Sequence, residues 1–275
     1  MTAPEPARRP RLVATDLDGT LLRSDGTLSD YTRRVIAATD EAGVPVVFVT
    51  GRPLRWMHHL WDAVGAHGLA ILGNGAIVFD VAAREVRTLH GFAPDPGLAV
   101  AERIRAAVPG VELGLEDLEG LLVENGFEGH RAGVRVGPFA EHWRAPAVKL
   151  LARHTTMPPE ELQAAVVAAV GDDATATWSM PGLVEISAAG VTKAFALARV
   201  CAELGIDAAD VVAFGDMPND LPMLGWAGTG IAVANAHEQV RAAADRTAPA
   251  NDEDGVARTV APLVGLTGDL VSWEA

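Results

Sequence analysis

The sequence predicts an α/β protein: a core built on a parallel sheet, with an α+β domain inserted into it. Three short apolar runs, at residues 12–14, 44–49 and 211–214, have the length and composition of buried strands. Helix-length segments separate such runs, as in parallel βαβ units. This alternation stops near residue 82 and resumes near residue 188, so we expect one domain to interrupt another.

The first part of the core is expected over residues 11–81. Ser29 is a suitable N-cap and Gly43 a suitable stop for a helix over residues 30–42. Pro53 suits the first turn of a further helix, which we expect to run to residue 64. The strands expected here cover residues 12–14, 44–49, 70–72 and 77–79.

The inserted domain, which we call the cap, is expected over residues 82–187. Its expected strands cover residues 111–115, 121–124, 148–153, 175–179 and 183–186, and its helices cover residues 98–108 and 159–170. Polar and apolar residues alternate in these strands. This pattern predicts an α+β domain whose sheet has one covered face.

The core resumes over residues 188–275. We expect strands at residues 211–214 and 230–234, and helices at residues 194–204, 221–226, 236–244 and 256–264. At the other end of the chain, residues 1–10 are polar, with Pro and Arg, and are expected to form a disordered tail. They lack the apolar stretch of a signal peptide, so we expect a cytoplasmic protein.

Composition limits the classes of partner. The net charge is −14 and no block of Lys or Arg is present, which argues against binding to nucleic acid or to an anionic membrane. No apolar run approaches the roughly 18 residues of a membrane span. The single cysteine, Cys201, excludes an internal disulfide framework and is expected in the core. The sequence does not indicate an oligomeric state.

The first candidate site follows the strand at residues 12–14. Asp16 falls at the carboxyl end of this strand, where open α/β sheets bind ligands. Gly19 lets the backbone turn, so that Asp18 can face the same site as Asp16. One carboxylate can then attack an electrophile or hold a metal, while the other moves a proton. The alternative is a turn or a calcium loop, but Thr27 stands where an EF-hand needs its Glu.

Polar residues also follow two other strands, and parallel topology brings such strand ends to one edge. They are Thr50 after the second strand, and Asp216, Asn219 and Asp220 after residues 211–214. Lys193 opens the helix that precedes this last strand. Carboxylates, a hydroxyl and an ammonium group suit phosphoryl transfer, with Mg²⁺ held by oxygen ligands.

Several segments resemble motifs of one known family. They are residues 16–20 (Asp-Leu-Asp-Gly-Thr), 50–52 (Thr-Gly-Arg), Lys193 and 215–220 (Gly-Asp-Met-Pro-Asn-Asp), together with residues 74–76 (Asn-Gly-Ala) and 251–255. The first four resemble the motifs of the haloacid dehalogenase-like (HAD) superfamily. The other two, with the long insertion after residue 52, are similar to its Cof-type phosphatase branch. The resemblance implies a Rossmann-like core with an α+β cap over the site, which would supply substrate specificity.

The resemblance also implies a role for each residue. Asp16 would be the nucleophile and form an aspartyl-phosphate, and Asp18 would be the general acid and base. Thr50, Gly51, Lys193 and Asn219 would bind the phosphoryl group. Asp16, the carbonyl of Asp18, and Asp216 would hold Mg²⁺, with Asp220 as support.

We therefore expect a Mg²⁺-dependent phosphatase for a small phosphomonoester, such as a sugar phosphate or related metabolite. Asp18 favours a phosphatase or mutase, because dehalogenases of this kind protonate no alcohol. A phosphosugar mutase and a non-catalytic phosphate-binding regulatory module remain as alternatives. Three arginines of the cap either bind substrate anions or are ordinary surface residues: Arg131, Arg135 and Arg144. His58 and His59 are either half of a zinc site or solvated residues beside core tryptophans.

Overall fold

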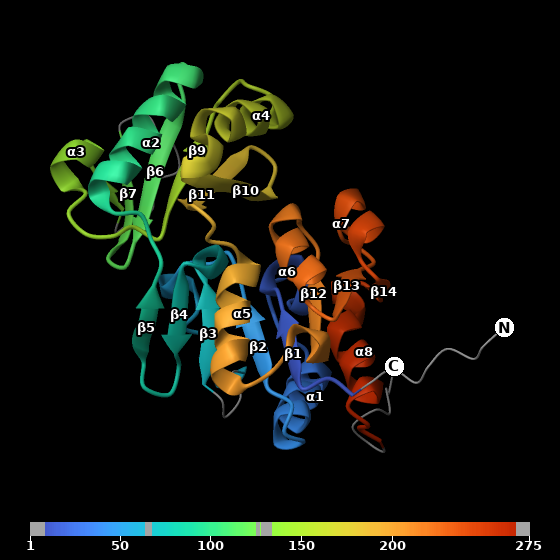
Figure 1. The fold of residues 1–275 in the computed structure, drawn as a ribbon. Coiled ribbons are helices and arrows are strands. Elements are labelled where there is room, and N and C mark those ends of the chain that lie inside the picture. The colour runs from blue at the N-terminus through green and yellow to red at the C-terminus, as the bar shows by residue number, and fades with distance from the viewer. Residues whose placement is uncertain (1–8, 64–67, 125–126, 128–133, 268–275) are drawn as a thin grey trace.

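The computed structural model describes residues 9–63, 68–124, 127 and 134–267. It contains an eight-stranded sheet in the order β14-β13-β12-β1-β2-β3-β4-β5 and a six-stranded sheet in the order β10-β11-β9-β6-β7-β8. The second sheet, with its helices, lies at one end of the first (Figure 1). The expected fold class, an α/β core with a parallel-rich sheet, is confirmed.

The first sheet is parallel from β14 to β3, and β4 and β5 extend it in antiparallel fashion. Its strands are β1 (Leu12–Thr15), β2 (Val46–Val49), β3 (Leu69–Leu72), β4 (Ile77–Asp80), β5 (Glu85–Leu89), β12 (Val211–Gly215), β13 (Thr229–Val233) and β14 (Arg246–Ala248). Both β1 and β12 are completely buried, as expected for strands covered on two faces.

The order of the strands reverses between β1 and β12. From β1 the chain proceeds to β2 and β3 on one side, and from β12 it proceeds to β13 and β14 on the other. Such a reversal opens a crevice at the carboxyl ends of the two strands, because their connections leave in opposite directions. The residues that follow β1 and β12 therefore meet at one place.

Two pairs of helices accompany this sheet: α1 packs against α8, and α5 packs against α6 (Figure 1). The core helices are α1 (Asp30–Glu41), α5 (Lys193–Leu204), α6 (Leu221–Trp226), α7 (Glu238–Ala243) and α8 (Gly255–Leu263). The expected cap of α1 is present, since Ser29 Oγ accepts the N–H of Thr32 at 3.0 Å. Thr192 caps α5 in the same way, which fixes Lys193 in the first turn. Within the described residues, no helix is long and apolar enough to cross a membrane.

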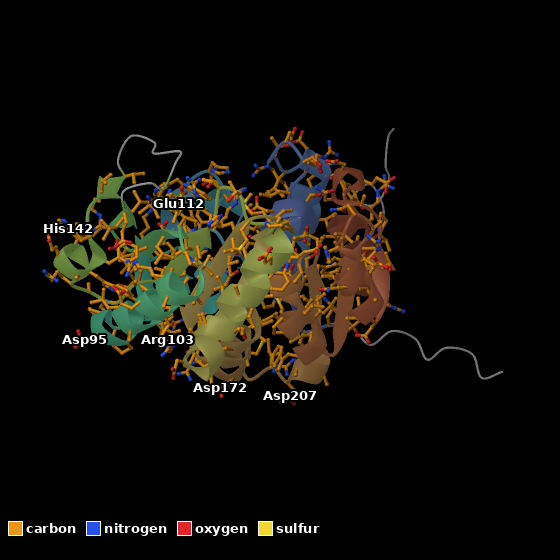
Figure 2. The ribbon with its side chains drawn as sticks, turned by 90° about the horizontal axis from the view of Figure 1, so that it is seen from above. Asp95, Arg103, Glu112, His142, Asp172 and Asp207 are labelled. Atoms are coloured by element: carbon orange, nitrogen blue, oxygen red, sulfur yellow. The ribbon has the colours of Figure 1, made fainter. Side chains whose placement is uncertain are left out.

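The second sheet is antiparallel except for the pair β7–β8. Its strands are β6 (Glu112–Asp117), β7 (Gly120–Val123), β8 (Arg135–Val136), β9 (Lys149–Arg153), β10 (Ala174–Met180) and β11 (Leu183–Ala188), and its helices are α2 (Pro94–Ala107), α3 (Phe139–His142) and α4 (Pro159–Val170). Helices α2 and α4 pack against each other. The charged residues Asp95 and Arg103 of α2 lie at the outer margin of the molecule (Figure 2).

Alternation along β9 gives the two faces of this sheet different roles. Leu150 and Ala152 belong to the apolar cluster of the cap, whereas Lys149, Leu151 and Arg153 line a cavity that also contains Asp16. The face opposite the helices is therefore turned towards the first sheet.

Two expectations need revision. The helix expected from Pro53 to residue 64 was wrong: the chain forms 3₁₀ turns at Leu54–Trp56 and Trp61–Ala63, and residue 64 lies outside the described part. A proline and bulky aromatic residues, without a regular apolar period, favour this irregular path. Strand β5 pairs with β4, so the first sheet continues past residue 82. We therefore propose that the cap begins at residue 90 rather than at residue 82.

Candidate active site

The carboxylates that follow β1 and β12 meet at the crevice between these strands. Thr15 lies beside Phe214 in the sheet, and the N–H of Asp16 donates to the carbonyl of Phe214 at 3.0 Å. Asp16, Asp216 and Asp220 each offer an oxygen within 4.8 Å of the others, and all three are buried. The sequence predicted that these acids lie together, and the structure brings them together.

Lys193 lies between two of these acids. Its ammonium group donates to Asp16 Oδ1 at 2.5 Å and to Asp220 Oδ1 at 2.6 Å, and its side chain is completely buried. Burial opposes the charged form, but the two carboxylates outweigh it and raise the pKa of Lys193 above its usual value. The lysine is therefore a permanent cation at the carboxyl end of β1.

Asp220 organises the loop after β12. Its Oδ2 accepts the backbone N–H groups of Asp216 and Met217, each at 3.0 Å. Asp216 in turn accepts the hydroxyl of Thr20 at 2.9 Å. Burial, followed by the charge of Asp220, raises the pKa of Asp216 to about 7.

This cluster has the composition of a site for a divalent cation. Burial, only partly offset by Lys193, raises the pKa of Asp16 well above its ordinary value. Three buried carboxyl groups face one ammonium group, so full ionisation of the cluster would leave an excess of negative charge that a cation would neutralise. Because all the donor atoms are oxygens, the cluster suits Mg²⁺ better than Zn²⁺.

Gly19 allows the two strand ends to approach closely. Its φ is +75°, and a Cβ at this position would lie 2.4 Å from Asp216 Oδ2. A side chain here would push Asp216 away from the cluster. Glycine is therefore required both for the turn and for the contact.

Thr50, Gly51 and Asn219 approach the site from neighbouring strand ends. Thr50 is buried, and its hydroxyl accepts the N–H of Arg52 at 3.1 Å. Asn219 donates through its side-chain amide to Asn74 Oδ1 at 3.1 Å. Gly51 and Asn219 line the same cavity as Asp16, whereas Thr50 is not among its lining residues.

Asp18 points into this cavity and is held by a residue to which no role was assigned from the sequence. Arg52 donates to both of its carboxylate oxygens, through Nε at 2.7 Å and Nη2 at 2.5 Å. Such bidentate pairs fix the geometry of a carboxylate. Arg52 belongs to the same predicted tripeptide as Thr50 and Gly51, so the sequence signal at residues 50–52 extends to this arginine.

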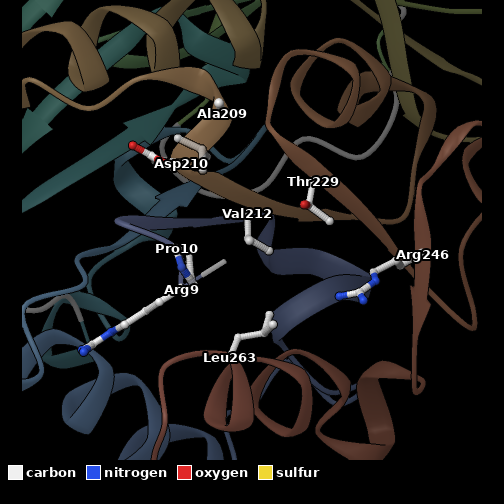
Figure 3. A pocket seen from close by; sticks show the side chains of 9 residues that line it. Arg9, Pro10, Ala209, Asp210, Val212, Thr229, Arg246 and Leu263 are labelled. Carbon is white, nitrogen blue, oxygen red and sulfur yellow. The ribbon is translucent and has the colours of Figure 1, made fainter. Parts of the chain in front are cut away.

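The cavity has a volume of about 990 Å³ and is lined by residues from both sheets, including Asp16, Asp216 and Lys149. A second cavity, of about 170 Å³, lies at the amino ends of β12 and β13, beside Arg9, Asp210 and Arg246 (Figure 3). It contains none of the predicted site residues. The large cavity contains Asp16, Asp18 and Asp216, so a substrate in it could reach these carboxylates.

Comparison with known proteins agrees with this geometry. Residues 13–260 match the family described as haloacid dehalogenase-like hydrolase. The chain belongs to this family. It is 30% identical to the 5-amino-6-(5-phospho-D-ribitylamino)uracil phosphatase YitU of Bacillus subtilis, over 91% of this chain and 96% of the relative. It is 32% identical to the phosphoglycolate phosphatase of Haloarcula marismortui, over 86% and 93%.

The fold of this HAD-like hydrolase also agrees with a solved structure. SMU.1108c of Streptococcus mutans superimposes with a TM-score of 0.82 and 21% identity, covering 93% of this chain and 99% of that one. The resemblance to the Cof-type phosphatase branch is confirmed, and the chain is a phosphoric monoester hydrolase of the HAD type.

The other candidates in the HAD-like hydrolase have different outcomes. Arg135 is paired with Asp117 at 2.5 Å, and Arg144 donates to backbone carbonyls. Neither lines the large cavity, and Arg131 lies outside the described residues. His58 and His59 line the cavity, but among the described residues they belong to no group of three or more side chains that could hold a metal.

Proposed function

We propose that this HAD-like hydrolase is a Mg²⁺-dependent phosphatase that cleaves a small phosphomonoester through an aspartyl-phosphate on Asp16. One observation carries the proposal. Asp16 is buried beside Lys193 at the crevice between β1 and β12, and Asp18, two residues further on, faces the same cavity. The placement provides a nucleophile and a proton carrier for one phosphoryl group.

In the first step, a carboxylate oxygen of Asp16 attacks phosphorus. A bond forms between this oxygen and phosphorus, while the bond from phosphorus to the ester oxygen breaks. Lys193 holds Oδ1, so the carboxylate is already oriented before the substrate arrives. Asp18, in its protonated form, gives its proton to the departing alkoxide, and the alcohol leaves.

In the second step, water hydrolyses the acyl phosphate. Asp18, now a carboxylate, takes a proton from the water as it attacks phosphorus. The bond between phosphorus and Asp16 breaks, so that inorganic phosphate leaves and the free carboxylate returns. Arg52 must release at least one oxygen of Asp18 for these transfers, and the partial exposure of Asp18, at 58% of its side chain, leaves room for this movement.

Thr50, Gly51, Lys193 and Asn219 would hold the phosphoryl oxygens. Asp16, the carbonyl of Asp18, and Asp216 would hold Mg²⁺, and Asp220 keeps the Asp216 loop in place through two backbone N–H groups. When bound, Mg²⁺ neutralises charge on the phosphoryl oxygens. The buried excess of carboxylate over ammonium supports a requirement for this cation.

Phosphate release from a panel of phosphomonoesters tests the proposal. We expect release with Mg²⁺ that EDTA abolishes. Asp16→Asn should reduce kcat by at least about 10³-fold, because the amide is a poor nucleophile, while circular dichroism shows a native fold. Release by Asp16→Asn at the wild-type rate would remove Asp16 as the nucleophile. Product isomerisation without free phosphate would instead indicate a mutase.

A further inference from the structure

The lysines and arginines that line the large cavity are paired with carboxylates, and much of the remaining wall is apolar. We propose that the enzyme selects substrates whose leaving group is uncharged and carries a planar ring, so that the phosphoryl group is the only anion of the substrate. This inference rests on the proposed phosphatase function. It follows from the residues of the large cavity, most of which belong to the cap and to the segment after Gly51.

Each lysine or arginine that lines the described part of this cavity already has a carboxylate partner. The pairs are Arg52 with Asp18, Arg55 with Glu116, Lys149 with Glu185, and Arg153 with Glu112. The Arg55 pair is bidentate, at 2.9 and 2.7 Å. Beyond the phosphoryl site, a second anionic group on the substrate would therefore find none of these four cations without a partner.

Breaking the pairs of Arg55 with Glu116 and Lys149 with Glu185 to bind an anion would be costly. The side chains of Glu116 and Glu185 are only 3% and 4% exposed, so loss of the partner would leave a buried, unpaired carboxylate. Lys149 is further held by the carbonyl of Gly51, at 2.7 Å. A carboxylate or second phosphate on the leaving group would also gain no net attraction from this wall, because Glu116 and Glu185 cancel the charges of Arg55 and Lys149.

The rest of the wall is apolar and offers surfaces for a ring. Trp56 and Met180 are large apolar residues with about half their surface exposed, at 50% and 52%, and both line the cavity. Leu121, Phe127, Leu151 and Leu183 add to this surface. Aromatic and thioether side chains favour contact with planar rings. A cavity of about 990 Å³ also exceeds the needs of a two-carbon leaving group.

The substrates named for the two relatives differ in the charge of the leaving group. The name of the Bacillus relative describes a phosphate ester with a uracil ring, whereas the name of the Haloarcula relative describes one with a carboxylate. The paired cations and the exposed Trp56 agree with the first type of leaving group and disagree with the second.

Matched benzyl phosphates test the inference. 4-Carboxybenzyl and 4-carbamoylbenzyl phosphate have nearly the same shape but differ by one charge. We expect kcat/KM for the carboxylate to be at least about tenfold lower, since a charge that finds no partner in the cavity loses its hydration without compensation. Benzyl phosphate should also exceed cyclohexylmethyl phosphate, which has a ring of similar size without a planar π-system.

Two variants assign these preferences to residues. Glu116→Gln frees Arg55 and should bring the carboxylate substrate to within about threefold of the carbamoyl substrate. Trp56→Ala should remove the preference for benzyl over cyclohexylmethyl. Glu141→Gln and Leu118→Ala change similar groups outside the cavity, and neither should alter these ratios. Thermal melts check that each variant folds. Arg55→Met removes the cation itself, so kcat/KM for the carboxylate substrate should remain low in this variant.

The outcomes separate this inference from the proposed function. If Asp16-dependent release is present but the carboxylate substrate is cleaved as well as its carbamoyl partner, the inference is overturned and the phosphatase assignment remains. Equal cleavage of the benzyl and cyclohexylmethyl esters overturns the ring preference. If no ester releases phosphate, the proposed function is overturned, and the inference with it.

Discussion

Arg52 binds Asp18 through two hydrogen bonds, of 2.7 and 2.5 Å, and joins the loop after β2 to the loop after β1. The guanidinium is mostly buried, with 15% of the side chain exposed, so it forms a fixed anchor for the more exposed carboxylate. Asp18 is the proposed carrier of two protons. Its position therefore depends on a residue 34 positions away in sequence.

Loss of this anchor should slow the reaction without preventing the fold. Arg52→Met should lower kcat/KM by about 10- to 100-fold, because a small displacement of a reacting group has a cost of this order. Arg52→Lys, which keeps the charge but loses the bidentate fork, should recover only part of the activity. Arg87→Met, at an exposed pair with Glu203, is the control. Wild-type kinetics in Arg52→Met would show that Asp18 needs no anchor.

Gly19 should control the affinity for the cation. Gly19→Ala places a Cβ 2.4 Å from Asp216 Oδ2, so Asp216 must move away from the acidic cluster. We expect the Mg²⁺ concentration for half-maximal activity to rise by at least about tenfold, since a bound group of this kind contributes on the order of 1.4 kcal/mol or more. The assay is a Mg²⁺ titration of phosphate release.

Gly26 offers a matched control for this substitution. Its φ is +81°, close to that of Gly19, but a Cβ there would meet no atom within 4 Å. Both alanine variants should lose about 1–2 kcal/mol of folding free energy through backbone strain, whereas only Gly19→Ala should change the response to Mg²⁺. An equal change in both would mean that backbone strain, rather than displacement of Asp216, is responsible.

The sequence was sufficient to predict the strands that position the site. β1 and β12 are short runs in which Thr15 is the one polar residue, and Asp16 and Asp216 follow them directly. The rule that ligands bind at the carboxyl ends of parallel strands then brings the two acids together. Strand β5 escaped prediction because its residues are half exposed and carry charges, so that only its pairing with β4 defines it.

Side-chain pairing across the cavity could not be predicted. Arg55 and Glu116 are 61 positions apart and belong to different sheets or their loops. Their contact depends on how the cap is placed over the core, and no local sequence pattern predicts this placement. The same holds for Lys149 and the carbonyl of Gly51. Short sequence motifs thus predict the residues of the phosphoryl site. The residues that line the rest of the large cavity can be paired only from the tertiary structure.

Cys201 should behave as a buried core thiol. Burial raises the pKa of this thiol to about 11, from an ordinary value of 9.0. The folded state therefore holds the proton that the unfolded state loses, and this contribution to stability is complete below pH 9 and is lost as the pH rises towards 11. Urea unfolding of wild type and Cys201→Ala should differ by a constant amount up to pH 9. Above it the difference should shrink, whereas a constant difference up to pH 11 would contradict the assignment.

Removing one member of the buried pair of Lys149 and Glu185 should greatly lower the free energy of unfolding. Burial raises the pKa of Glu185, but the charge of Lys149 and hydrogen bonds from Lys149, Ser179 and Asn74 together outweigh this effect and hold the pKa below its usual value. Ser179 donates to the other carboxylate oxygen at 2.9 Å. Lys149→Met leaves Glu185 charged and buried, and should lower the free energy of unfolding by about 3–5 kcal/mol.

A second substitution separates the pair from simple loss of packing. In Lys149→Met/Glu185→Gln no buried charge remains, and Gln can keep its bond to Ser179, so more than half of the lost stability should return. Because the pKa of Glu185 is lowered on folding, its contribution is present above its ordinary value of 4.5 and is lost as the pH falls below it. Wild type should therefore lose more stability than the double variant between pH 5 and about pH 3. Arg103→Met, at a pair whose side chains are 42% and 70% exposed, should change stability by less than about 1 kcal/mol. Equal urea midpoints for Lys149→Met and Arg103→Met would show that the buried pair has no special role.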